Sequence, residues 1–404
     1  MRIAIVAEKT RTCEKDFAST LDQVTNHLAA RGHSLLLFAS EDLAWTGKNV
    51  QKVELPHFVL PLVSEPKMVA PLSVRREMRR QLRVFQPDVV HLMNPCFLGL
   101  LGLREARRLE APVVASYHRE IAGWPPPYQS SPVDDIRWAY LRWIYNRTDV
   151  SLCPSKFTRF QLQLEGFKGI KVWSPGVNVA LFHPHRRDAM WRDRLSGGSP
   201  DQPLLLYTGD SHSNNGLAVL CDMLDRVEGV RLAIAGKGVG DDEVQNSFEG
   251  TNATLVKPLD GLDLARAYAS ILEGMASGVP VVAAATGAGM ELVSDCDRGF
   301  LYWPDDAEDL AEAIRLFLSY RDCGRRLGSR ARTYAESQSW SKVVGRLLAY
   351  YEDALVQRPV LRHAAERERW RPMSGLEVLL GGMGEASRVE PVSLSAAIDD
   401  PGDG

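Results

Sequence analysis

The chain has 404 residues, of which 45% are hydrophobic and 25% charged, and its formal net charge at pH 7 is -3. This length accommodates two domains with substantial cores, and the composition and near balance of charge argue against a disordered chain and against a nucleic-acid-binding protein. The six cysteines form no CxxC pair and have no metal-ligand spacing, so we expect reduced, packed thiols and no metal site. The opening MRIAIVAE has too short an apolar run for a signal peptide or a membrane span, which predicts a cytoplasmic protein.

The N-terminal part, residues 1–178, alternates apolar strands with amphipathic helices. The runs RIAIVAE and DVVHLM have the composition of parallel strands that are covered on both faces. Helical patterns lie between such runs, including one over residues 17–30 that is expected to end at Gly32. This alternation predicts a doubly wound, Rossmann-like α/β domain.

One helix of this part, RWAYLRWIYNR over residues 137–147, carries arginine beside tryptophan and tyrosine. Such a mixture suits a membrane interface, so peripheral contact with a membrane surface is one interpretation. In an ordinary amphipathic helix, Trp138, Leu141 and Ile144 would instead pack inward, which is the more common arrangement.

The polar stretch HRRDAMWRDRLSGGSPDQP is typical of a linker, and the pattern then begins again with a new first strand, LLLYTGDS. Residues 179–340 therefore predict a second Rossmann-like domain, in which Asp305 is expected to cap a long amphipathic helix. A helix over 341–357 is expected to cross back to the N-terminal domain, and the charged, Gly-rich residues 358–404 predict a disordered tail. The two domains would face each other across a cleft at the carboxyl ends of their strands, where ligands bind in such folds.

Three features could carry chemistry at that cleft. His118 ends the strand VVASYHRE, where a side chain leaves the sheet, although an isolated His is as often structural. Glu273 could accept hydroxyl groups of a nucleotide ribose, or it could be an ordinary exposed helix residue. The turns AGKGVG (235–240) and TGAGM (286–290) could bring backbone amides close to a phosphate. Because the first strand is followed by no GxGxxG fingerprint, a nicotinamide dehydrogenase is not favoured.

A set of motifs in one order over about 340 residues narrows these alternatives. The motifs are FQPDVVHLMNP, APVVASYHRE, NRTDVSLCPSKFT, WSPGVNVALFHP, LLLYTGD, LEGMASGVPVVAA and RGFLYWPDDAEDLAEAI. Together they resemble the family-four retaining glycosyltransferases of the GT-B fold, nearest the branch of sulfoquinovosyltransferases and lipid mannosyltransferases. The resemblance implies transfer of a hexose from a UDP- or GDP-linked sugar to a lipid or other hydroxyl acceptor, with retained configuration and without a metal or other cofactor.

The resemblance also assigns residues. It implies that His118 lies near the donor sugar, that Glu273 binds the donor ribose, and that further donor-binding positions are Gly209, Asp210, Asn215, Gly236, Lys237 and Gly287.

The chain departs from the family pattern at these positions. Asp210 and Asn215 replace the Arg and Lys expected to hold the diphosphate, a change worth about 3–4 kcal/mol, and Lys237 is the candidate substitute cation. The family's first Glu falls at Ala265, and the interior strand that precedes the LEGMASG motif is missing, so one helix is expected over 262–277. Two alternatives stay open: an active glycosyltransferase, or a catalytically inactive relative or truncated isoform that acts as a binding partner.

Overall fold

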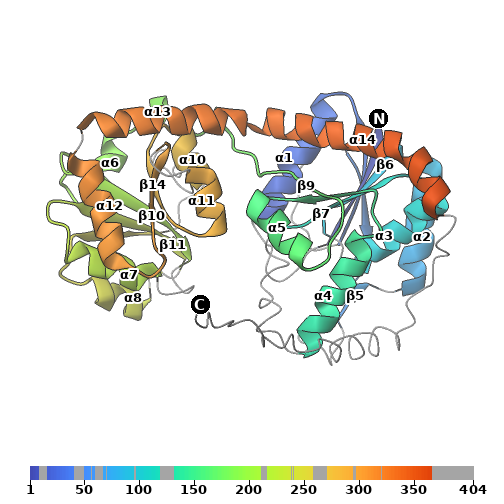
Figure 1. Cartoon of the computed structure of the whole chain (residues 1–404), viewed down its shortest axis with the longest axis horizontal. Coiled ribbons are helices and arrows are strands. Elements are labelled where there is room, and N and C mark those ends of the chain that lie inside the picture. Colours follow the sequence, from blue (N-terminus) through green and yellow to red (C-terminus); the bar gives the residue numbers. More distant parts are fainter. Residues whose placement is uncertain are drawn as a thin grey trace, which may run out of the picture.

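The computed structural model describes two lobes joined along one side by the last two helices (Figure 1). The described residues are 1–8, 16–40, 50–55, 57–59, 67–69, 71–94, 97–118, 132–210, 216–237, 239, 241–257, 271–293, 297–319 and 321–365.

The N-terminal lobe is built on one sheet of seven parallel strands in the order β3-β2-β1-β6-β7-β8-β9. Its strands are β1 (Arg2–Ala7), β2 (Ser34–Ser40), β3 (Gln51–Leu55), β6 (Val89–Leu92), β7 (Val113–Ser116), β8 (Val150–Cys153) and β9 (Ile170–Val172). Its helices are α1 (Asp16–Ala30), α2 (Pro71–Phe85), α3 (Phe97–Arg108), α4 (Pro132–Tyr145) and α5 (Lys156–Leu164), and β4 (His57–Val59) and β5 (Lys67–Val69) form an antiparallel pair.

Alternate residues of the central strand enter two separate cores. Ile3 and Ile5 point into the core that α1 covers, whereas Ala4 and Val6 point into the core beneath α2, α3 and α4. All four side chains are fully buried, as expected for a parallel strand covered on both faces. The predicted doubly wound N-terminal domain is therefore confirmed.

Two helices of this lobe turn aromatic or charged side chains toward their neighbours. In α4, Leu141 and Ile144 are buried and Trp138 packs edge-on against Phe167, so these side chains face inward and α4 does not offer them to a membrane. In the Arg-rich α2, arginines pair with Glu105 of α3, which is only 1% exposed. That face of α2 is thus an ion-paired contact with α3.

The C-terminal lobe contains two sheets rather than one. The first has the parallel order β10-β11-β12 and the second pairs β13 with β14. The strands are β10 (Leu204–Asp210), β11 (Arg231–Lys237), β12 (Ala253–Val256), β13 (Val281–Ala284) and β14 (Gly299–Tyr302), and the helices are α6 (Ala189–Leu195), α7 (Gly216–Leu224), α8 (Asp242–Phe248), α10 (Ile271–Ala276), α11 (Gly287–Val293), α12 (Ala307–Ser319) and α13 (Arg321–Ser337).

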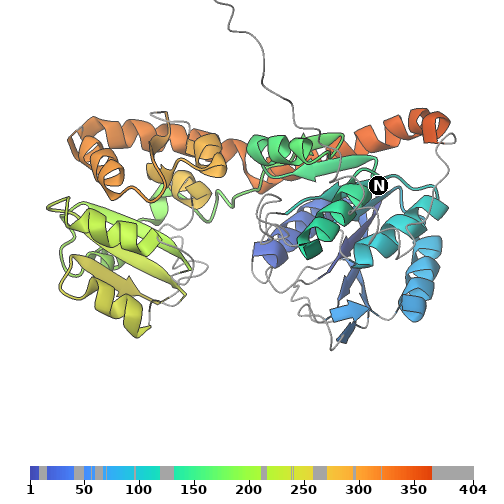
Figure 2. The same cartoon turned by 60° about the horizontal axis from the view of Figure 1, so that its bottom comes forward.

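The division lies where the sequence predicts a missing interior strand. Among the described residues no ladder joins β10 to β13, and no strand lies between β12 and β13. The helix expected over 262–277 is described only as α10, which ends at Ala276, and residues 258–270 lie outside the described part. Figure 2 shows β10, β11 and β12 beside α7 and α8, below the orange helices of the second sheet.

Three expectations need correction. The stretch expected to be a linker contains the short helix η3 (Pro184–Arg186) and helix α6, whose Trp191 and Leu195 are buried against the first sheet. The cap of α12 is Asp306, which accepts from the backbone amides of residues 308 and 309 at 3.0 Å, and not Asp305. The last helix, α14 (Trp340–Ala365), continues eight residues past the expected end at 357; residues 366–404 lie outside the described part.

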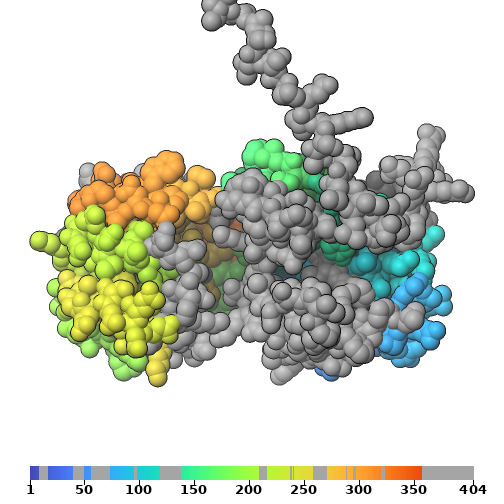
Figure 3. Space-filling model, turned by 90° about the horizontal axis from the view of Figure 1, so that it is seen from below, coloured from blue at the N-terminus to red at the C-terminus, as the bar shows by residue number. Residues whose placement is uncertain are grey.

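Helix α14 follows α13 along the same side of the molecule and packs on the N-terminal sheet (Figure 1). Its Val343, Leu347 and Tyr351 are fully buried in the core that α1 also covers. The Trp173 indole donates to the carbonyl of Val343 at 3.1 Å. Seen from below, the yellow-green and orange C-terminal lobe lies on the left, and α2 and α3 of the N-terminal lobe, in blue and cyan, lie on the right (Figure 3).

Candidate functional site

His118 lies two residues beyond β7, at the carboxyl edge of the N-terminal sheet. Its ring stands edge-on to Phe17 of α1 with ring centres 5.4 Å apart. Burial lowers the pKa of His118 to about 4, so the imidazole is neutral at pH 7. Its Nε2 atom is buried and has no hydrogen-bond partner among the described residues, which do not include 119–131. A buried ring nitrogen without a partner is uncommon, and it suggests a group that a ligand completes.

A small cavity of about 50 Å³ adjoins this histidine. Aromatic and small side chains line it, among them Tyr117, Cys153, Trp173 and Trp340. Burial raises the pKa of the Cys153 thiol to about 12, so the thiol is neutral and unsuited to act as a nucleophile. The cavity therefore offers mainly packing surface, and among its polar side chains His118 has a buried ring nitrogen without a partner in the described part of the chain.

A second buried histidine, His91, lies on the neighbouring strand β6. Its Nδ1 is 2.7 Å from the Tyr351 hydroxyl of α14, and its Nε2 is 2.7 Å from the Ser116 hydroxyl at the end of β7. Burial, assisted by the proximity of His118, lowers the pKa of His91 to about 3. Sequence analysis missed this residue because it stands inside an apolar run and its partner Tyr351 is 260 residues away. We read His91 as a structural group that fixes α14 and the end of β7.

Glu8 and Asn94 complete the same edge of the sheet, after β1 and β6. Both side chains are buried, at 6% and 1% exposure. The Glu8 carboxylate accepts from the Leu98 amide at 2.8 Å, in the first turn of α3, while the Glu8 amide donates to the Asn94 side chain at 2.8 Å. The carboxylate thus satisfies an amide that the start of a helix leaves unpaired. Both residues stand in quoted motifs, but only the fold shows that they meet.

In the C-terminal lobe, four of the predicted donor residues meet at one strand edge. Gly209 is paired in register with Gly236, and Asp210 with Lys237, at the carboxyl ends of β10 and β11. Lys237, the candidate substitute cation, is therefore the register neighbour of Asp210, the acid expected at the position of the family's Arg. Asn215 lies outside the described residues.

The other two predicted donor residues flank the second sheet. Glu273 is half-buried in α10, and its carbonyl accepts from the Ser277 amide at 2.9 Å as the helix ends. Gly287 opens α11 on the other side of β13. Because the two sheets share no ladder in the described chain, no strand pairing fixes Glu273 relative to Gly209 and Lys237.

Helix α11 also makes a contact between the lobes. A Cβ atom at Gly287 would collide with the Phe157 ring of α5. Farther along α11, the Glu291 carboxylate accepts from the Lys156 amide at 2.6 Å, at the start of α5. The beginning of α11, expected to face an anion, therefore faces an N-terminal helix in this structure. Glu291 stands in the TGAGMELV run but was not singled out, because its partner belongs to the other lobe.

Neither a metal-binding cluster of His, Cys, Asp or Glu nor a helix able to span a membrane occurs within the described ranges.

Comparison with known proteins matches residues 18–181 to Glycosyltransferase Family 4 and residues 202–319 to Glycosyl transferases group 1. A GDP-mannose-dependent alpha-mannosyltransferase of Mycolicibacterium smegmatis is 32% identical over 389 residues, which are 89% of this chain and 99% of that protein. The sulfoquinovosyl transferase of Arabidopsis thaliana is 29% identical over 294 residues, covering 67% of this chain and 58% of that protein, so the chain spans little more than half of its length.

Solved structures show the same architecture. A glycosyltransferase from Rickettsia africae has a TM-score of 0.69 at 15% identity, covering 88% of this chain and 98% of that chain. The Anabaena protein HepE, determined in complex with UDP-glucose, has a TM-score of 0.65 at 15% identity, covering 87% and 100%. These likenesses confirm the predicted GT-B fold.

Proposed function

The chain belongs to glycosyltransferase family 4, and we propose that it transfers a hexose from a nucleoside diphosphate sugar to a hydroxyl group of a lipid or other small acceptor, with retained configuration. GDP-mannose is the first donor to test, because relatives that match this chain over nearly their whole length are named GDP-mannose-dependent mannosyltransferases. A UDP-linked hexose is the alternative donor. A cytoplasmic location and peripheral membrane contact stay predictions.

The observation that carries this proposal is the state of His118. A neutral imidazole whose buried Nε2 lacks a partner in the described chain can exchange one hydrogen bond with a hydroxyl group of the donor sugar. Such a bond can orient the sugar at the carboxyl edge of the sheet, where ligands bind in doubly wound folds. Because the ring stays uncharged at pH 7, it does not add a positive charge next to the developing positive charge of the sugar.

In this proposal the C-terminal lobe holds the nucleotide and the diphosphate. The Glu273 carboxylate accepts from two ribose hydroxyls. Backbone amides near Gly209 and Gly236 approach the phosphates, since glycine allows close contact, and Lys237 supplies the positive charge. Asp210 beside Lys237 weakens that charge, so we expect slow turnover.

The test is release of GDP and transfer of mannose by the purified full-length chain with GDP-mannose and a panel of lipid and sugar acceptors. Replacing His118 by Ala should lower kcat by about 10²–10³, and Glu273→Gln should mainly raise the KM for the donor. Arg186→Gln, an exposed change far along the chain from both residues, is the matched control. Added EDTA should leave the rate unchanged. Absence of turnover and of donor hydrolysis with every GDP- and UDP-sugar would refute the proposal.

The second candidate is a catalytically inactive relative that acts by binding. It is favoured by one specific observation, the placing of an acid, Asp210, beside the candidate cation Lys237. This candidate predicts donor binding without turnover, and it predicts that the double change Asp210→Arg and Asn215→Lys restores no activity. Measurable transfer by the unaltered chain would exclude it.

A further inference from the structure

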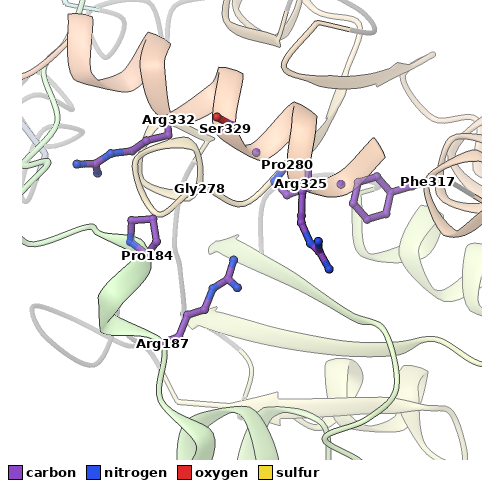
Figure 4. Close-up of a pocket in the computed structure, with 10 residues that line it drawn as sticks. Pro184, Arg187, Gly278, Pro280, Phe317, Arg325, Ser329 and Arg332 are labelled. Carbon is purple, nitrogen blue, oxygen red and sulfur yellow. The ribbon is translucent and has the colours of Figure 1, made fainter. Parts of the chain in front are cut away.

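A cavity of about 440 Å³ lies in the C-terminal lobe, apart from all the predicted donor residues. Its walls come from three segments: η3 and the residues after it, the turn after α10, and α13 with the end of α12 (Figure 4). The volume is that of a small-molecule site.

Two arginines from different segments converge in this cavity. Arg187 extends from the segment after η3 and Arg325 from α13, and their guanidinium groups point into the same space (Figure 4). Both residues are exposed, and neither guanidinium group has an ion-pair or hydrogen-bond partner within the described chain. On α13, Arg330 pairs with Asp297 at 2.9 Å and Arg332 with Glu336 at 2.7 Å, whereas Arg326, like Arg325, has no such partner among the described residues. The two open charges repel each other, which favours an anion between them.

The wall behind these arginines is closely packed. The Arg332 guanidinium donates to the carbonyls of Val179 at 3.2 Å and Phe182 at 2.8 Å, and so fastens the segment between the lobes to α13. A Cβ atom at Gly328 would collide with the Gly278 carbonyl, which shows how closely α13 packs on the turn after α10. Arg332 thus holds the segment that carries Arg187, and the turn after α10 packs on the helix that carries Arg325. Both arginines therefore project into a preformed cavity.

The remaining lining suits a ring rather than a bare ion. Phe317, Pro184 and Pro280 present flat apolar surfaces, and Ser329 supplies a hydroxyl group. Among the described residues that line the cavity there is no carboxylate. Apolar surfaces with a few convergent polar groups are the usual composition of a site for a small organic ligand.

We propose that this cavity binds a small organic phosphate, whose phosphate group bridges Arg187 and Arg325 and whose ring packs on Phe317 and the two prolines. Guanidinium groups bind phosphate through paired, charge-assisted hydrogen bonds. Because Arg187 belongs to the segment that joins the lobes and Arg325 to α13, a bound phosphate ties these elements together. The site uses none of the predicted donor residues, so it stands whether or not the chain transfers sugar.

The test is calorimetric titration of the full chain with glucose 6-phosphate, inorganic phosphate and glucose at low ionic strength. Glucose 6-phosphate should bind saturably and more tightly than inorganic phosphate, and glucose should not bind. The double variant Arg187→Gln with Arg325→Gln should weaken glucose 6-phosphate binding at least about tenfold. The matched control, Arg186→Gln with Arg326→Gln, removes the same charge from neighbouring exposed positions and should bind like the unaltered chain.

Four results would overturn the proposal. Equal binding by the two double variants would mean that general charge attracts the ligand, and failure of the unaltered chain to bind glucose 6-phosphate would mean that the cavity takes no such phosphate. Inorganic phosphate that binds as tightly as glucose 6-phosphate would exclude a role for the ring surfaces. Glu273→Gln should leave the affinity unchanged, whereas a loss there would place the ligand at the predicted donor site. Thermal unfolding of each variant shows that the fold is retained.

Discussion

The two lobes are both built from parallel strands and helices, but they differ in how completely their strands are buried. In the N-terminal lobe a continuous sheet of seven strands buries every residue of β6, β7 and β8. In the C-terminal lobe the strands fall into two sheets; β11 is buried from Leu232 to Ala235, but β12 and β13 have one buried residue each, Val256 and Ala283. The difference suggests that the N-terminal lobe, with α14 packed on it, supplies most of the stability, while the predicted donor residues stand on the less buried lobe.

The largest test of this comparison is a matched pair of cavity-forming substitutions. Val6→Ala empties a fully buried site in the N-terminal sheet and should lower the free energy of unfolding by about 2–3 kcal/mol. Val282→Ala removes a half-buried side chain from β13 and should cost only about 1 kcal/mol. Urea unfolding followed by intrinsic fluorescence measures both, and equal losses would contradict the comparison.

The second test is acid unfolding. The folded-state pKa of His118 is about 4 and that of His91 about 3, both below the ordinary value of 6.5 because the rings are buried. Below pH 6.5 the unfolded chain therefore binds protons that the folded chain does not, and stability falls as the pH falls. For His118 the loss should approach about 3 kcal/mol by pH 4. Unfolding free energies measured from pH 7 to 4 check this.

In the acid test, His118→Gln should make the unfolding free energy depend less on pH. The matched control is His185→Gln, a change at an exposed position that should not alter the pH dependence. The described residues of the C-terminal lobe from 189 to 319 include no histidine, so acid should weaken the N-terminal lobe first. Earlier loss of the C-terminal lobe would count against this reading.

A third test weakens the attachment of α14. Tyr351→Phe removes the hydroxyl that meets His91 at 2.7 Å, leaves a buried ring nitrogen unsatisfied, and should cost about 1–3 kcal/mol. Tyr350→Phe, the matched control, removes a bond to the Val172 carbonyl at a half-buried site, and it should cost less, about 0.5–1.5 kcal/mol. Thermal and urea unfolding measure the loss of stability in each variant. A larger loss for Tyr350→Phe than for Tyr351→Phe would show that the bond to His91 has no special role.

The smallest effect concerns the contact between the lobes. Glu291→Gln removes the charge that faces the start of α5 and should change stability by only about 0.3–1 kcal/mol. Gly287→Ala should displace the Phe157 ring and separate α11 from α5. Small-angle X-ray scattering should then show a larger radius of gyration for the Ala variant, and an unchanged radius would show that the contact does not hold the lobes together.

Much of the N-terminal lobe could be predicted because its central strands, such as β1 and β7, are apolar runs, as full burial on both faces requires, whereas the edge strand β3 is mostly polar. Helix α6 was missed because its two buried residues, Trp191 and Leu195, are too few to show a helical period within a polar stretch. The site was less predictable for a different reason. Its supporting bonds, such as those from His91 to Tyr351 and from Glu8 to Leu98, join distant parts of the chain, and local patterns do not record them.

The gap between the two C-terminal sheets has a consequence for nucleotide binding. Within the described chain β10 has a ladder partner only on its β11 side and β13 only on its β14 side, so side-chain packing between α7 and α12, and not strand pairing, joins the two halves. In the proposed function one nucleotide sugar would contact both the half with Gly209 and Lys237 and the half with Glu273. Donor occupancy should therefore slow hydrogen exchange in both halves at once.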